Sequence, residues 1–140
     1  MTDDLVRAAL DHATDQHRAV LVTRRRDGSL QSSPITVTTS PRETLWISAR
    51  AGSAKARNLA RDPRATLCLV SDAWYAPWLH VDGTTVVHRV PEAVDLLVEY
   101  YRRASGEHED WDDFRRSVVE EDRVLLEVTP ERVSAPVAPS

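Results

Sequence analysis

The chain has 140 residues, which is enough for one domain with a single hydrophobic core and too few for two. Its hydrophobic content of 41% and charged content of 29% are ordinary for a globular protein and exclude a disordered chain, and the formal net charge of −4 argues against broad nucleic-acid binding. No apolar run approaches the ~20 residues of a membrane span, the acidic start lacks the features of a secretion signal, and one cysteine excludes an internal disulfide, so we expect a cytoplasmic protein.

The first fifty residues predict one helix and three strands. Apolar residues at helical spacing indicate an amphipathic helix from Asp3 to about Gln16. Runs rich in β-forming residues predict strands at 18–26, 30–39 and 44–50. Pro34 inside the second strand requires a free edge or a bulge, because proline cannot donate to a strand ladder. The third strand alternates in character, which predicts one buried face and one polar face that ends in Arg50.

The rest of the chain predicts three helices and three strands. A short helix is capped by Ser53, and two longer helices begin at Pro91 and after Asp110. Strands are expected at 64–71, 79–90 and 124–128, with a bulge or a bend at Gly83. The tail from Pro130 is punctuated by prolines, and residues from about 134 are expected to be loose within one domain spanning 1–140. This order predicts an α+β protein with a small antiparallel barrel and flanking helices.

A basic segment follows the third predicted strand. Its cations are Arg50, Lys55, Arg57, Arg61 and Arg64. Lys55, the only lysine in the chain, lies in the first turn of the short helix, where backbone N–H groups lack partners and the helix dipole is positive. Such a site suits a phosphate, and Arg57 can add a bidentate contact. The alternative is a solvated basic helix face.

Four stretches of the chain resemble a known family. They are Gly28–Ile35, Ser48–Arg64, Tyr101–Arg115 (with Gly-Glu-His-Glu-Asp-Trp-Asp-Asp-Phe inside it) and Arg123–Val133. Together they resemble the pyridoxamine-phosphate-oxidase-like split β-barrel proteins, and within them most closely the actinobacterial branch that uses the deazaflavin coenzyme F420. The resemblance runs from about Val6 to Val133. It implies a split, FMN-binding-like barrel of about six mainly antiparallel strands.

The resemblance also implies a homodimer with the cofactor in a groove between the subunits. Its phosphate would be held by the segment around Lys55 and Arg57, and its ring would lie along the second and third strands. The positions that match this pattern are Gln31, Ser33, Ser48, Arg50, Lys55, Arg57 and Asn58. Two alternatives stay open: Arg50 can form a surface ion pair with Glu43 or an acidic helix, and a strand glutamine can simply face solvent.

Other residues have less specific interpretations. Trp74, Tyr75 and Trp78 can form an apolar wall for a flat substrate, or pack at the barrel end or a dimer interface. His80 and His88 lie ~25 Å apart on one strand, too far to share a metal, so we expect no metal site. The residues expected to be core are Cys68, Trp111 and Phe114. His108 is expected to order its loop through a hydrogen bond.

The resemblance implies an F420-dependent reductase, in which the reduced cofactor donates a hydride to a small conjugated electrophile. Hydride transfer demands little of side chains, so we name no catalytic acid or base. One alternative is an FMN-dependent oxidoreductase on the same barrel. Another is a carrier that binds F420 or haem without turnover. We expect small-molecule partners and no nucleic-acid partner, and we expect no membrane span.

Overall fold

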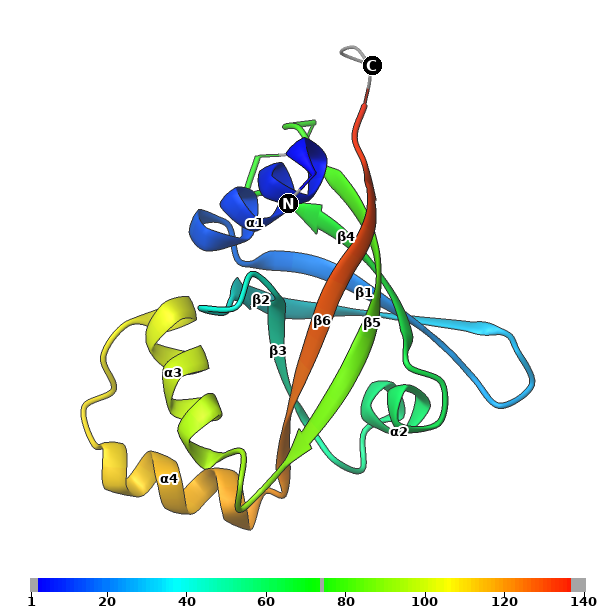
Figure 1. Ribbon diagram of the computed structural model, residues 1–140. Coiled ribbons are helices and arrows are strands. Elements are labelled where there is room, and N and C mark those ends of the chain that lie inside the picture. Colours follow the sequence, from blue (N-terminus) through cyan, green and yellow to red (C-terminus); the bar gives the residue numbers. More distant parts are fainter. Residues whose placement is uncertain (1–2, 74, 137–140) are drawn as a thin grey trace.

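Six strands pair antiparallel and close into a barrel (Figure 1). The computed structural model describes residues 3–73 and 75–136. The strands are β1 (Arg18–Arg24), β2 (Leu30–Thr39), β3 (Leu45–Arg50), β4 (Arg64–Val70), β5 (Leu79–Arg89) and β6 (Arg123–Ser134), in the barrel order β1-β2-β3-β6-β5-β4. The helices are α1 (Asp4–Asp15), α2 (Ala54–Arg61), α3 (Val94–Ser105) and α4 (Trp111–Glu120). The α+β split barrel expected from the sequence is confirmed.

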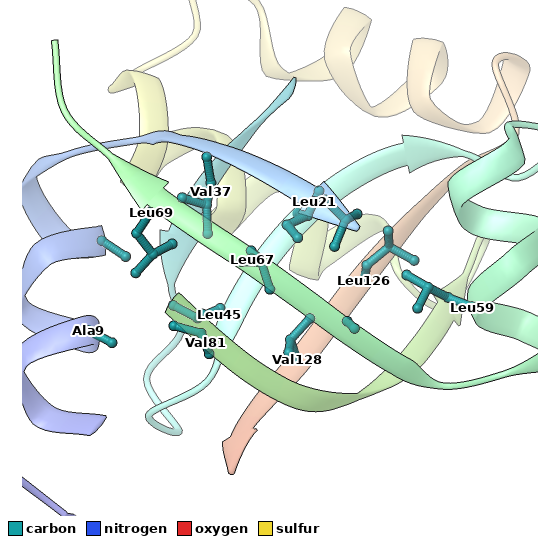
Figure 2. Packing of buried hydrophobic residues seen from close by; sticks show 14 of the residues in the cluster. Ala9, Leu21, Val37, Leu45, Leu59, Leu67, Leu69, Val81, Leu126 and Val128 are labelled. Atoms are coloured by element: carbon teal, nitrogen blue, oxygen red, sulfur yellow. The ribbon is translucent and has the colours of Figure 1, made fainter. Parts of the chain in front are cut away.

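Alternation along the strands fills the barrel with aliphatic side chains (Figure 2). Leu21, Leu67 and Leu126 are fully buried there, because every second residue of their strands points inward. Helix α1 packs at one end of the barrel through Ala9, and α2 packs at the other through Leu59. The short helix α2 is therefore anchored on its apolar side and leaves its basic side outside.

A second apolar cluster lies outside the barrel, between β3 and the helix pair α3 and α4. It contains Trp46, Leu97, Val118 and Leu125. The predicted polar face of β3 is therefore wrong at Trp46, which is only 3% exposed, whereas Ser48 is half-buried and Arg50 is exposed. The strand alternates as expected, but helices from the distant C-terminal half cover its second face.

The C-terminal strand is longer than the sequence predicts. Strand β6 continues past Pro130 to Ser134 and pairs with β5 throughout, so the proline-punctuated segment up to that point is not loose. Pro130 is tolerated because it lies opposite Gly83, where the register shifts. The bulge expected at Gly83 lies instead on the facing strand: Asp82 and Gly83 pair with Arg132 and Pro130, so the extra residue is Glu131 of β6. Residues 137–140 of the expected tail lie outside the described part of the chain.

The helix boundaries follow their caps. Ser53 accepts a hydrogen bond from the backbone N–H of Ala56 at the start of α2, and Asp110 accepts one from Asp113 at the start of α4. Both predicted caps are confirmed. Helix α3 begins at Val94 rather than at Pro91, because residues 91–93 form a turn. No described helix is long and apolar enough to cross a membrane.

The barrel has a fork between β2 and β3. Strand β2 pairs with β1 over its whole length, but with β3 only at residues 37–39. Among the described strands, residues 30–36 of β2 therefore have a partner on one side alone. The free edge expected from Pro34 is confirmed, and it opens the space in which the candidate site lies.

Candidate functional site

A groove of about 580 Å³ occupies the fork and extends beneath α3 and α4. Its lining has three parts: the edge of β2, a polar and charged part, and an apolar part. These are, in turn, Pro34, Ile35 and Thr36; Ser48, Lys55, Ser117, Glu121 and Arg123; and Leu97, Tyr100, Tyr101, Phe114 and Val118. The groove is thus apolar on the helical side and mainly positive at the end near α2.

Lys55 reaches this groove from the second residue of α2. Within the described residues its side chain makes neither a hydrogen bond nor an ion pair, and the same holds for exposed Arg57. The other cations of the basic segment are occupied. Arg61 donates to the carbonyl of Arg24 (2.8 Å), and Arg64 pairs with Asp62 (2.7 Å). Lys55 and Arg57 are therefore the cations of this segment that remain available to a ligand.

Glu121 separates two arginines at the rim of the groove. Its Oε1 lies 3.2 Å from Nη2 of Arg50, and its Oε2 lies 3.3 Å from Nε of Arg123. Arg50 therefore takes the alternative that the sequence left open, an ion pair with the acidic end of a helix, whereas Glu43 pairs with Arg7 instead. Since Glu121 and Arg123 both line the groove, Arg50 adds its charge indirectly.

Asn58 is 7% exposed and its carboxamide is used inside the fold. Its Nδ2 donates to Oγ1 of Thr23 (3.1 Å), and its Oδ1 accepts from Nη2 of Arg61 (3.2 Å). These bonds fasten α2 to β1. The residue that resembles a cofactor contact in the family pattern thus has a clear role in placing the helix that carries Lys55.

Gln31 and Ser33 share a face of β2, as the sequence predicts. They lie opposite Thr23 and Leu21 of β1, so their side chains follow the inner face of the sheet. Ser48 points to the outer face of β3, beneath the helices. The structure therefore brings Ser48 and Lys55 together in the groove, and places Gln31 and Ser33 outside its lining, on the arm of β2 beyond the fork.

The aromatic wall of the groove was missed by sequence reasoning. Tyr101 contacts the rings of His108, Trp111 and Phe114, with centroid distances of 5.2, 5.8 and 5.1 Å. Trp111 and Phe114 were expected to be core; instead both are half-buried and form this cluster between α3 and α4. The difference arises because the rings of Trp111 and Phe114 contact Tyr101 of α3, whereas α4 packs against the outside of the barrel through Val118.

His108 orders its loop as expected, since its Nδ1 accepts a hydrogen bond from the backbone N–H of Asp110 (2.9 Å).

Cys68 was expected to be core, and this is wrong. It lies half-buried on the outer face of β4, because the neighbouring Leu67 and Leu69 point inward, and partial burial raises the pKa of its thiol.

The remaining candidates lie elsewhere. His80 is 3.1 Å from Oδ1 of Asp82, and His88 is 2.9 Å from Oε1 of Glu127, so each imidazole has its own carboxylate. Tyr75 is 94% exposed in the β4–β5 loop, at the barrel end near α1 (Figure 1), and Trp78 is 42% exposed in the same loop. Neither lines the groove of its own chain. Trp74 lies outside the described residues.

Known proteins share this architecture. Residues 3–135 match the sequence profile of a family described as Pyridoxamine 5'-phosphate oxidase. The fold is similar to that of a conserved hypothetical protein from Mycobacterium tuberculosis, at 21% identity and a TM-score of 0.75 over 96% of this chain and 84% of that chain. It is similar to an F420 reductase, at 19% identity and a TM-score of 0.68 over 96% of this chain and 98% of that chain.

A third similar structure is the haem storage protein HutZ from Vibrio cholerae, at 16% identity and a TM-score of 0.70 over 93% of each chain. Identities this low relate these structures by fold alone. The family profile, in contrast, spans nearly the whole sequence from the first turn of α1 to the end of β6. The chain therefore belongs to the pyridoxamine 5'-phosphate oxidase family.

Proposed function

We propose that the protein is a cytoplasmic reductase that binds coenzyme F420 in the groove and reduces a small conjugated electrophile. One observation carries the proposal: Lys55 faces the groove from the start of α2 without any partner among the described residues. An unpaired ammonium beside the positive end of a helix favours a phosphate. Arg57, two residues further and likewise without a partner in the described part of the chain, supplies a second cation on the same helix.

The groove also fits a flat ring. Tyr101 and Phe114 offer aromatic surface on one side, and β2 offers backbone on the other. The N–H of Val37 donates to the carbonyl of His17, the residue before β1, so the N–H of Thr36 points the opposite way, into the fork. Pro34 shares that direction and offers a carbonyl without an N–H. A ring with alternating polar groups on one edge would meet both an amide donor and a carbonyl acceptor.

The residues of this chain bind, orient and exclude water, and none is assigned as an acid or base. Reduced F420, when bound, supplies the hydride. Lys55 and Arg57 hold the anionic part, and the aromatic wall fixes the plane of the ring. We propose that Gln31 and Ser33 contact the polar edge from the β2 arm, that Ser48 and Arg50 support the same site, and that Asn58 acts by positioning α2.

We also propose that the protein is a homodimer. The outer face of β1 and β4 carries half-buried apolar side chains, among them Val20, Val22 and Val70, and no described helix lies over its middle (Figure 1). A second copy on this face would complete the groove and give Tyr75 and Trp78 a place in the partner's site.

FMN and haem are the alternative ligands. FMN also carries a phosphate and has a similar ring, so Lys55 suits it as well. Haem iron takes His, Cys, Met or Tyr as ligand. Of these types the groove lining contains two tyrosines alone, and the hydroxyl of Tyr100 is already bonded to a strand carbonyl. The site chemistry therefore favours a deazaflavin or flavin over haem.

The test is a titration of F420, FMN and haem, each followed by quenching of the fluorescence of the four tryptophans. We expect F420 to bind tightest, and reduced F420 to be oxidised when quinones are added. Binding of FMN without F420 would overturn the cofactor assignment. Tight binding of F420 without turnover of any conjugated acceptor would favour the carrier.

A further inference from the structure

The fork between β2 and β3 is bridged by one side chain. The β2–β3 ladder pairs Thr39 with Leu45, Thr38 with Trp46, and Val37 with Ile47. Continued in the same register, the next pair would be Thr36 with Ser48. Both strands stay extended beyond this point, β2 to Leu30 and β3 to Arg50, yet they separate here.

The backbone groups of that next pair face each other across the fork. Val37 bonds toward β1, so Thr36 directs its carbonyl away from β1. On β3, Trp46 pairs with Thr38 across the ladder, and by alternation Ser48 directs its N–H toward the same gap. Extended strands with such facing groups would normally pair, because a free backbone donor or acceptor under a helix is costly.

Tyr100 of α3 occupies this gap. Its hydroxyl donates to the carbonyl of Thr36 (2.9 Å), and its ring lines the groove. Burial raises the pKa of this phenol, and the backbone N–H of Ser48 near the phenol oxygen opposes that rise. The hydroxyl thus satisfies the Thr36 carbonyl and lies toward the Ser48 N–H, the two groups that a direct Thr36–Ser48 hydrogen bond would join.

Two further features support this placement. Arg103, one turn further along α3, donates from Nη1 to the carbonyl of Thr39 (3.2 Å), so the helix is fastened to β2 at both positions. Beyond Thr36, the same register would place Pro34 opposite Arg50, and proline has no N–H for that pair. Closure of the fork is therefore hindered by Tyr100 at one pair and by Pro34 at the next.

We infer that Tyr100 is a positioning residue whose hydroxyl replaces the Thr36–Ser48 pair of the β2–β3 ladder and so keeps the groove open. Without the hydroxyl, the Thr36 carbonyl and the Ser48 N–H pair directly, and the strands close by one residue into the ligand space. The effect on the fork stands on the geometry alone, whereas the effect on cofactor affinity rests on the proposed function.

The test compares Tyr100→Phe with the wild-type protein, and Thr84→Val serves as the control that loses a hydrogen-bonded hydroxyl on β5, away from the groove. Amide hydrogen exchange and scalar coupling across hydrogen bonds are followed by NMR without ligand. The wild-type protein should show no coupling between the Ser48 amide nitrogen and the Thr36 carbonyl carbon. Tyr100→Phe should show this coupling and slower exchange at Ser48, and Thr84→Val should match the wild type.

A direct Thr36–Ser48 coupling in the wild-type protein would overturn the inference, even if the variant fails to fold. Faster exchange at Ser48 in Tyr100→Phe, without coupling, would show that ring bulk holds the fork open and would also overturn it. Affinity for F420 and FMN is measured on the same samples, and Tyr100→Phe should bind roughly tenfold more weakly. If the wild-type protein binds neither, the proposed function fails while the NMR result still decides the role of Tyr100.

Discussion

At the scale of single residues, the site depends on which cations are already used. The basic segment carries five positive charges, but internal partners occupy Arg50, Arg61 and Arg64. An exposed ion pair contributes little to stability, yet it does bring a carboxylate next to the guanidinium and so weakens its attraction for other anions. The charge that faces the groove is therefore set by Lys55 and not by the sum over the segment.

This argument predicts that Lys55→Ala weakens cofactor binding by about 1.5–3 kcal/mol, the scale of a hydrogen bond to a charged group. The matched control is Arg64→Ala, which removes the same charge from the same segment at a residue already paired with Asp62. Isothermal titration of both variants with the cofactor that the wild type binds gives the comparison. Equal losses in the two variants would mean that general charge, and not the site, attracts the ligand.

At the scale of elements, the sequence predicts most of the fold because most of its elements are locally determined. Strand alternation and the caps at Ser53 and Asp110 are predicted correctly from neighbouring residues. The errors arise where distant elements decide. The outer face of β3 is covered by helices some fifty residues later in the chain, and β6 continues past Pro130 because it forms a bulge there and keeps its pairing with β5.

The candidate site also has a part that the sequence predicts and a part that depends on distant elements. The helix that carries Lys55 could be found from its composition and cap. The aromatic wall could not, because Tyr100 and Tyr101 are adjacent on one helix and a single apolar stripe accounts for only one of them. The rim pair of Glu121 and Arg123 comes from the α4–β6 turn, whose approach to Lys55 depends on barrel closure.

Glu127 shows how one side chain connects three strands. From β6, its Oε2 accepts from Oγ1 of Thr44 (2.7 Å) and from Nε1 of Trp46 (3.2 Å) beside β3, and its Oε1 lies 2.9 Å from Nε2 of His88 on β5. Burial alone would raise the pKa of this carboxyl, but the hydrogen bonds from Thr44, His88 and Trp46 outweigh burial and lower the pKa below its usual 4.5. The ionised form is therefore favoured by the fold.

We predict that Glu127→Gln lowers the free energy of unfolding by about 1–3 kcal/mol near neutral pH, because a half-buried acceptor of three donors is replaced by a neutral amide. A carboxyl with a lowered pKa in the folded state stabilises above its unfolded pKa, and this contribution is lost as the pH falls through the folded value. The difference between variant and wild type should thus persist above 4.5 and shrink below it. Urea unfolding across this range measures it.

Glu109→Gln is the control, since Glu109 is exposed in the α3–α4 loop and should change stability by less than about 0.5 kcal/mol. A difference for Glu127→Gln that stays constant from neutral to acidic pH would contradict the assigned role of the charge. A difference near zero throughout would show that the three hydrogen bonds are replaced by water without loss.

At the scale of the whole molecule, the helices cover the barrel unevenly. Helices α1 and α2 pack at the ends and α3 and α4 lie beside β3 (Figure 1), so the outer face of β1 and β4 is left with apolar side chains and the half-buried Cys68. The free arm of β2 borders the same face through its pairing with β1. One uncovered surface thus adjoins the fork, and a second copy there would border both grooves at once.

The last prediction concerns this surface. Val22 lies on the outer face of β1, between buried Leu21 and Thr23, and Val22→Asp should convert a dimer into monomers. A carboxylate at an apolar interface loses its hydration without gaining a partner, whereas on a monomer surface it costs little. Light scattering coupled to size-exclusion chromatography gives the mass. Val86→Asp, at a 54% exposed valine of β5 beyond the end of β4, should leave that mass unchanged. A wild-type monomer would refute the dimer, and a dimeric Val22→Asp would place the interface on another face. If dimerisation completes the groove, the monomeric variant should also lose cofactor affinity while it keeps its unfolding temperature.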